Sequence, residues 1–373
     1  MDNEQKLFLR NYEETLKNCS KKLIEEDGKT LITYISKSKK NGVIALSLLP
    51  YLALYCRSAQ EFFCQKIIED ELDKQIKDLR NGLKIYANRY NQGKRETFDA
   101  DKRQNKIFED RLRFSFMKKW NIHYNLGVYF DAYGHIIGDT QLFDYFLNIT
   151  SPKGQNMNKH AFQIGNMLGK KLENILHDMC GLSSLVANLC IIDCPKYGYR
   201  DFNTNRTDGF FNNEVGKELN LIILHIVSTI GFVEHIVRLM LPNDNLWLFR
   251  IEYIVAHYAW SGLKKIKQHF DNNTLNCFSN NPDITFMVEM GATLFPSNFR
   301  NCMMHYDLSH KGIPAIPKEY YNPNKQLYGL VESCFGGTTY YELSSELRNY
   351  LLNFENCLLA WFCIDIKRIR WNL

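Results

Sequence analysis

The stretch LNLIILHIVSTIGFVEHIVRLML, from Leu219 to Leu241, is the most apolar run of the chain and decides its fold class. It is long enough to span a bilayer, but it contains His225, Glu234 and Arg238. Ionisable side chains are costly at the centre of a bilayer. The run therefore predicts a buried helix of a soluble protein rather than a membrane span.

Two further helical patterns follow this run. The segment LWLFRIEYIVAHYAWSGLKKIKQHF predicts a helix over about 246–270, and a later periodic segment predicts one over about 340–366. The later helix has a clear start, because Thr339 is followed three residues on by Glu342, which is the capping-box pattern. The apolar run itself predicts a helix over about 214–241 that ends at Pro242.

The N-terminal part of the chain is also helical in pattern. EQKLFLRNYEETLKNCSKKLIEE repeats apolar residues at three- and four-residue intervals, and AQEFFCQKIIEDELDKQIKDLRNGLKIYANRY continues the pattern with charges between. The polar segments at 91–106 and 193–213 predict loops. For FDAYGHIIGD, residues 130–139, a short strand pair and an irregular turn both remain open.

Composition places the protein in a broad class. The chain has 373 residues, of which 45% are hydrophobic, so it can form a sizeable core. Its net charge of +5 is mild and does not by itself imply a nucleic-acid partner. Its eleven cysteines are scattered, several in apolar runs, and its N-terminus is charged throughout. These features predict reduced thiols, no secretory signal and a cytoplasmic location, with no membrane association.

We therefore predict an all-α fold made of helical bundles. An N-terminal helical region of unknown role is expected over residues 1–150, and a C-terminal helical bundle over residues 160–373.

The segment FPSNFRNCMMHYDLSH, residues 295–310, combines packing residues with polar groups suited to phosphate chemistry. Pro296 cannot lie in a helix interior, and Ser297 or Asn298 would make a good N-cap. We therefore expect a helix to begin near Phe299.

Arg300 and Asn301 then fall in the first turn, where unpaired N–H groups and the helix dipole favour an anion. Asn301 and His305 are four residues apart and share a helix face. The chain offers its own comparison for this spacing, because other Arg-Asn pairs lack the histidine. These pairs are Arg10-Asn11, Arg80-Asn81 and Arg348-Asn349, and the residues five after each arginine are Thr15, Ile85 and Asn353.

The motif FRNCMMHYD resembles the Arg-polar-x-x-x-His signature of HEPN domains, the higher-eukaryote and prokaryote nucleotide-binding helical domains. FRIEYIVAHYAWSGLKKI is similar to the preceding helix of prokaryotic members, and the resemblance covers the C-terminal part of the chain only. It implies a dimerising helical bundle. Many HEPN proteins are metal-independent endoribonucleases of toxin, CRISPR-linked and anti-phage systems, and others have lost catalysis. By this resemblance Arg300 and His305 carry the chemistry and Asn301 is accessory.

The chemistry of these side chains agrees with that role. Histidine titrates in the range needed for proton transfer, and arginine grips phosphate oxygens in a fork. Cleavage without a metal needs a base for the 2′-OH and an acid for the 5′-oxygen. One histidine cannot comfortably serve on both sides of the phosphorus, so a homodimer with a shared cleft is attractive. No cofactor is expected.

Further substrate contacts are expected from the helix over 246–270. Arg250, Tyr253 and His257, with Trp260, follow one side of it and would line the same cleft to hold or stack RNA. Tyr306 is expected to contribute as well. The alternative, an aromatic packing stripe with a polar edge, is at least as consistent with the pattern.

Two other groups of residues could bind a metal ion. The first has a loosely zinc-like spacing, but it lies in an apolar segment, where buried free cysteines are common; its members are His177, Cys180, Cys190 and Cys194. The second has no recognised metal-site spacing and consists of His123, Asp131 and His135.

The function that the sequence favours is a metal-independent endoribonuclease that cleaves RNA by 2′-OH attack. Its expected biology is that of a toxin or anti-phage defence effector with an antitoxin or defence-system partner. The alternative is a non-catalytic helical module that binds a partner protein or nucleotide.

Overall fold

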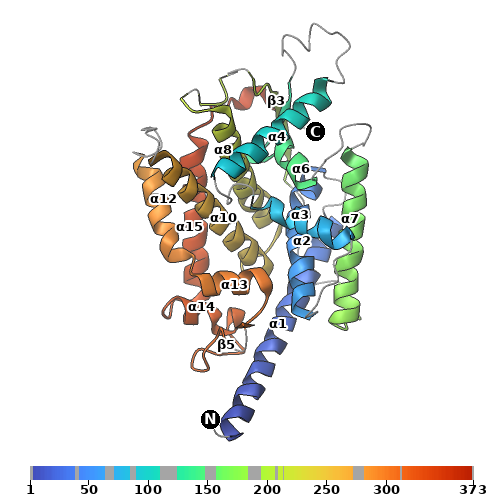
Figure 1. Ribbon diagram of the computed structural model, residues 1–373, viewed down its shortest axis with the longest axis vertical. Helices are drawn as coiled ribbons and strands as arrows, with labels where there is room; N and C mark the ends of the chain where they lie inside the picture. Colours follow the sequence, from blue (N-terminus) through green and yellow to red (C-terminus); the bar gives the residue numbers. More distant parts are fainter. Residues whose placement is uncertain are drawn as a thin grey trace.

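The computed structural model describes residues 3–37, 42–63, 71–84, 90–109, 124–147, 157–183, 195–205, 209–212, 214–271, 281–310 and 313–371. The fold is predominantly helical (Figure 1). Helices of the N-terminal part are α1 Asn3–Lys37, α2 Gly42–Phe63, α3 Glu71–Gly82, α4 Tyr90–Glu109, α6 Thr140–Leu147 and α7 Met157–Asn174, with a π-helical turn, η1, at Ile175–Met179.

The C-terminal part contains the helices predicted from the strongest patterns. They are α8 Lys217–Phe232, π-helical η2 Val233–Val237, α9 Arg238–Met240, α10 Leu246–Asp271, α12 Pro282–Leu294, α13 Ser297–His305, α14 Leu330–Cys334 and α15 Tyr340–Leu359, with short 3₁₀ turns η3 Gln326–Gly329 and η4 Ile366–Arg368. The capping box is confirmed, because Thr339 and Glu342 exchange both bonds. The last helix ends at Leu359, earlier than expected.

The all-α expectation needs one correction, because the described residues include a four-stranded antiparallel sheet of order β2-β1-β3-β6. Its strands are β1 Leu126–Asp131, β2 Ile136–Asp139, β3 Tyr197–Phe202 and β6 Arg370–Trp371, and a separate short pair joins β4 Ser309–His310 to β5 Ile313–Pro314. FDAYGHIIGD is thus a strand pair, and part of the loop expected at 193–213 is β3. The central strand β1 is largely buried, which hides the alternation that would have marked a strand.

The apolar run Leu219–Leu241 forms the buried centre of the fold. By length and composition α2 and the α8–α9 segment could each cross a membrane, but 78% and 94% of their most apolar windows are buried inside the protein. Gly231 on α8 packs directly on the sheet, where an added Cβ would lie 2.0 Å from the carbonyl oxygen of Ile136. Only glycine permits so close an approach of helix to strand.

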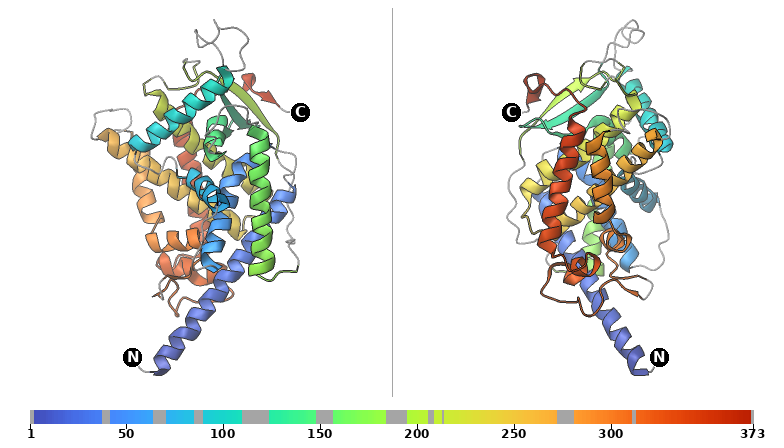
Figure 2. Two further views of the ribbon diagram at one scale, coloured as in Figure 1. Left: turned by 45° about the vertical axis from the view of Figure 1, so that its right-hand side comes forward. Right: turned by 90° about the vertical axis from the view of Figure 1, so that its left-hand side faces the viewer.

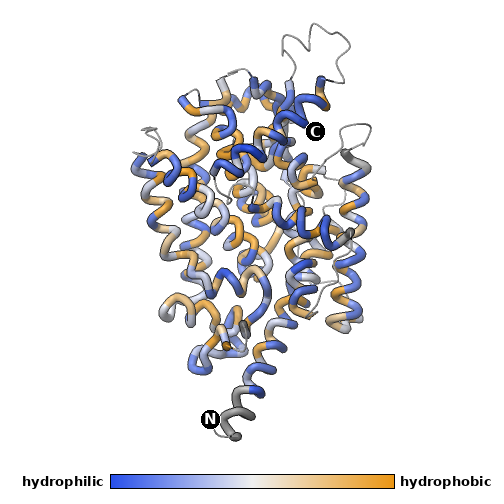
Figure 3. The backbone as a smooth tube through the Cα atoms, viewed as in Figure 1, coloured by the Kyte–Doolittle hydropathy of each residue, from blue (hydrophilic) through white to orange (hydrophobic). Residues whose placement is uncertain are grey.

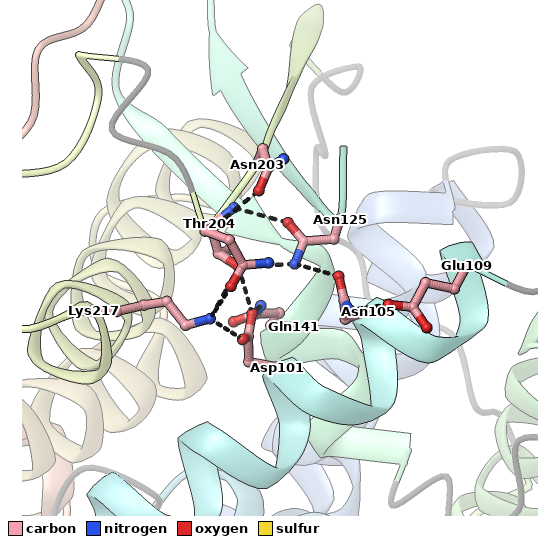
Figure 4. A network of polar contacts seen from close by, with 9 residues as sticks. Asp101, Asn105, Glu109, Asn125, Gln141, Asn203, Thr204 and Lys217 are labelled. Atoms are coloured by element: carbon pink, nitrogen blue, oxygen red, sulfur yellow. Dashed lines mark hydrogen bonds and ion pairs between the residues drawn. The ribbon is translucent and has the colours of Figure 1, made fainter. Parts of the chain in front are cut away.

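Helix α4 corrects a second expectation, because the polar segment at 91–106 was expected to be a loop. Its polar side chains enter a buried network that joins α4 to the sheet (Figure 4). Asp101 accepts hydrogen bonds from Gln141 at 2.6 Å and from Thr204 at 2.8 Å, and pairs with Lys217. Asn125 donates to Thr204 at 2.8 Å. The helix is therefore stabilised by buried polar contacts rather than by an apolar face.

Residues from both parts of the chain form one hydrophobic core. The long helix α1 crosses the fold beside α2 and α10, and its N-terminal end protrudes from the body (Figure 2). Along most helices hydrophobic and hydrophilic residues alternate (Figure 3), as expected when each helix contributes one face to a shared core. The division between 1–150 and 160–373 stays a prediction, but the site described next is built from both parts.

Candidate functional site around helix α13

Helix α13 begins two residues earlier than predicted, directly after Pro296. The N–H of Arg300 donates to the carbonyl oxygen of Pro296 at 3.0 Å, so the expectation of an unpaired amide at Arg300 is wrong. In a helix that starts here, the N–H groups without a helical partner belong to Ser297, Asn298 and Phe299. Any anion held by Arg300 would therefore be held by its side chain.

The C-terminal end of α13 is fixed from three sides. Tyr306 follows the helix in the left-handed conformation, with φ of +56°, which costs a non-glycine residue about 1 kcal/mol. Its hydroxyl donates to Asp27 Oδ2 at 2.6 Å. Arg250 donates to the carbonyl oxygen of Met303 at 2.8 Å, and Ser58 donates to that of Met304. The bonds from Arg250 and Ser58 satisfy carbonyl groups that a helix end leaves unpaired.

Arg250 is the centre of this support. Its Nε lies 2.7 Å from Asp27 Oδ2, and its guanidinium lies 3.9 Å from the centre of the Tyr306 ring. Arg250, Tyr306 and Asp27 are all buried. The structure therefore places Arg250 and Tyr306 beneath α13, where they position it, and not on a surface that a substrate would reach.

His305 and Asn301, four residues apart on α13, both line an open groove of about 980 Å³. Other parts of its lining come from Glu61 on α2 and from Asn298 and Asp307. The His305 side chain is 39% exposed, and its Nδ1 lies 3.1 Å from Glu61 Oε2. A carboxylate can only accept at neutral pH, so Nδ1 donates, and in the neutral ring Nε2 is then the acceptor atom.

Glu61 is a site residue that the sequence analysis missed. Its Oε1 accepts from Arg57 Nε at 2.7 Å, and Arg80 Nη1 lies 3.5 Å from the same atom. Burial alone would raise the pKa of Glu61, but the hydrogen bonds from His305 and Arg57, together with the charge of Arg80, lower it to about 2. Glu61 is therefore a permanent carboxylate that orients the imidazole. The Arg57-x₃-Glu61 spacing is visible in the sequence, but such i,i+4 pairs are too common to mark a site.

Arg300 points to a different side of α13. It is not among the residues that line the groove, although its Nη1 donates to Asn301 Oδ1 at 2.9 Å. Burial lowers the pKa of Lys84, and the charges of Arg80 and Arg300 lower it further. Burial and then Arg300 also lower the pKa of His257, to about 4. The guanidinium of Arg300 thus faces a region that already holds positive charge.

We call Arg57, Arg80, Lys84 and Arg300 the cationic cluster. Within the described part of the chain, Glu61 is the carboxylate whose bonds and charge reach Arg57, Arg80 and Lys84. The Nε atoms of Arg80 and Arg300 are buried and have no hydrogen-bond partner among the described residues. Buried donors normally have partners, so the cluster is incompletely hydrogen-bonded, and its positive charge favours an anion.

The remaining predicted site residues lie close to this cluster or outside the described residues. Tyr253 is buried, with its ring centre 4.8 Å from that of Phe299, so it packs under α13. His257 is half-buried and its ring lies 5.6 Å from that of Phe295. Of the zinc-like group, His177 lies in η1 and Cys180 is buried beside it, whereas Cys190 and Cys194 lie outside the described residues.

Comparison of the chain with models of protein families, with curated proteins and with solved structures gives no match, so the fold and the site are interpreted from their own geometry.

Proposed function

We propose that the protein is a metal-independent endoribonuclease whose proton-transfer and phosphate-binding groups lie around α13. The observation that carries this proposal is the placement of one carboxylate, Glu61, between the partly exposed His305 and the cationic cluster. A histidine oriented by a carboxylate is a competent general base. Positively charged side chains favour a phosphate backbone.

In the proposed reaction, Nε2 of His305 removes the proton from the ribose 2′-OH. The 2′-oxygen attacks the adjacent phosphorus and forms a bond to it, and the bond from phosphorus to the 5′-oxygen breaks. The products are a 2′,3′-cyclic phosphate and a 5′-hydroxyl end. Asn301 would contact the same strand in the groove, and Arg300, bonded to Asn301, would stabilise the charge that develops on the phosphate.

The departing 5′-oxygen requires a proton. The His305 ring that has taken the 2′-OH proton lies on the opposite side of the phosphorus and cannot deliver it there. A homodimer would supply it from the second copy of His305, and for this reason we retain the expectation of a shared cleft. The resemblance to HEPN domains adds the expectation of a cytoplasmic toxin or anti-phage effector with an antitoxin or defence partner.

One observation favours a second function. Among the described residues, His305 lines the groove and Arg300 does not. A non-catalytic module would use the cationic cluster to hold a nucleotide or an acidic partner without cleaving it. Both functions require an anion bound at the cationic cluster. Only RNA cleavage requires His305.

The test compares wild type with His305→Ala and with His160→Ala, a partly exposed histidine on α7 that serves as the control. Each protein is incubated with end-labelled RNA oligonucleotides in EDTA. We expect cleavage by wild type and by the control, a loss of at least about 100-fold in His305→Ala, and 2′,3′-cyclic phosphate ends.

Cleavage that survives in His305→Ala would refute the catalytic role. RNA binding without cleavage in wild type, weakened by Arg300→Ala but not by His305→Ala, would establish the binding module instead. Replacing the ribose at the cut site by deoxyribose should abolish cleavage, because no 2′-OH remains to attack.

A further inference from the structure

A second group of chemically capable side chains lies at the sheet end of the fold, away from α13. Asp131 ends β1 and His135 precedes β2, so the two belong to one hairpin. His235 lies in the π-helical turn η2, and Glu355 lies in the last turns of α15, whose C-terminal end approaches the sheet (Figure 2, right, red). Residues distant in sequence therefore converge from three segments.

The donor atoms of this group face one another. Asp131 Oδ1 accepts from the backbone N–H groups of Tyr133 at 2.9 Å and His135 at 2.8 Å, so Oδ2 is left for the rings. Oδ2 lies 2.8 Å from His135 Nδ1 and 4.0 Å from His235 Nδ1. The two imidazoles stack with centres 3.8 Å apart and planes 5° apart. Both Nδ1 atoms are thus directed to one carboxylate oxygen.

Glu355 fixes the orientation of His235 from the opposite side. Its Oε2 accepts from His235 Nε2 at 2.8 Å, which leaves Nδ1 of that ring unprotonated when the ring is neutral. A carboxylate that holds the outer nitrogen of a histidine is the usual support of a metal ligand. Glu355 is 2% exposed, and its Oε1 finds no hydrogen-bond partner within the described residues.

Two buried carboxylates belong to this group, because Asp131 is 5% and Glu355 is 2% exposed. Buried carboxylates are normally paired with a positive group or bind a metal ion. A divalent cation beside Asp131 would be such a partner.

We propose that Asp131 Oδ2, His135 Nδ1 and His235 Nδ1 bind one divalent transition-metal ion of the zinc type. One ligand atom from each of the three residues lies within 4.8 Å of the other two. In a tetrahedral site with bonds of about 2.0–2.2 Å, neighbouring donors lie about 3.3 Å apart. The separations from Asp131 of 2.8 Å and 4.0 Å fall on either side of that value. Because a metal ion lies near the plane of each imidazole that binds it, the two rings must also turn out of their parallel stack when the ion binds.

The surroundings are suited to such an ion. Two nitrogen donors and one carboxylate are ligands that Zn²⁺ accepts, and three protein ligands leave a fourth position for water. His135 is 32% exposed, which gives the ion an entry route. The π-helical turn places His235 in this register, and such turns recur at functional sites. A bound ion would join the hairpin to η2, and Glu355 would extend that connection to α15.

The test uses the full-length protein after EDTA treatment and removal of the chelator, titrated with ZnCl₂ alone in a calorimeter. We expect one ion per chain with micromolar or tighter affinity and a raised melting temperature. His135→Ala and His235→Asn should each weaken binding by at least about 100-fold, and Glu355→Gln by about 10- to 100-fold. His160→Ala, the control, should bind as wild type does.

CoCl₂ in place of zinc identifies the ligands by absorption. Bands typical of nitrogen and oxygen ligands that disappear in His235→Asn support the site. Thiolate-to-cobalt absorption, or zinc binding unchanged in both histidine variants, would overturn it. Should either variant fail to give a native circular dichroism spectrum, Asp131→Asn replaces it, because that change keeps the oxygen that accepts the two backbone bonds. These readouts do not depend on RNA cleavage.

Discussion

The Glu61→Gln substitution tests the electrostatic centre of the α13 site. The pKa of Glu61 is lowered to about 2 in the folded protein against an ordinary value of 4.5. Such a difference corresponds to about 3.4 kcal/mol of stability at neutral pH. Since 29% of the Glu61 side chain is exposed, solvent screening reduces this contribution, and we expect Glu61→Gln to lower the free energy of unfolding by about 2 kcal/mol at pH 7.

The pH dependence gives the sign of the effect. Because the pKa of Glu61 is lower in the folded protein than in the unfolded chain, its stabilisation is complete above pH 4.5. It is lost as the pH falls from 4.5 toward 2, where the carboxyl is neutral in both states. At pH 3.5 about three-fifths of the difference between wild type and Glu61→Gln should remain.

Urea unfolding at pH 7 and at pH 3.5 measures both quantities, with Glu13→Gln as the matched control. Glu13 pairs with Lys17 at 3.2 Å in an exposed i,i+4 pair on α1, and its substitution should cost less than about 0.5 kcal/mol at either pH. A cost for Glu61→Gln no larger than that of the control at pH 7, or one that does not shrink at pH 3.5, would refute the reasoning.

Three further predictions concern buried contacts of the fold. Arg250→Met leaves the carboxylate of Asp27 buried without its ion-pair partner, and should lower the free energy of unfolding measured in urea by about 3–5 kcal/mol. Adding Asp27→Asn should restore part of this loss. Strictly additive costs of the two substitutions would show that the two side chains do not stabilise each other. The pKa of His257 is lowered to about 4, so the unfolded chain takes up its proton first and stability should fall as the pH drops from 6.5 to 4. Unfolding curves of His257→Gln across that range should lack this component. Gly231→Ala forces α8 from the sheet and should cost about 3 kcal/mol, whereas Gly165→Ala, in open space on α7, should be neutral or stabilising by thermal melting.

The sequence predicted the elements whose burial follows a simple period. α8, α10 and α15 were found because apolar residues or a capping box marked them. Helix α4 was missed because its buried side chains are largely polar, and Asp101 among them is satisfied by partners on α6, on α8 and just after β3. Only the folded arrangement shows that such polar groups are inside.

The site was predicted only where its members are neighbours in sequence. Spacing alone placed Asn301 and His305 on one face of a helix. The partner of His305 is Glu61, which is 244 residues away, and no local pattern relates the two. Arg250 and Tyr306 were expected at the surface because their chemistry suits RNA, whereas the structure uses the same chemistry to secure the end of α13.

The pairing of residues across the two parts of the chain limits how this protein can be divided. A fragment of residues 160–373 would retain His305 without the carboxylate that orients it, and Arg250 without its counter-ion Asp27. Helix α13 would then lose the contacts that secure its C-terminal end and the charge of Glu61 beside His305. Recombination or truncation that separates the two parts should therefore destabilise α13 and leave His305 without the carboxylate that orients it.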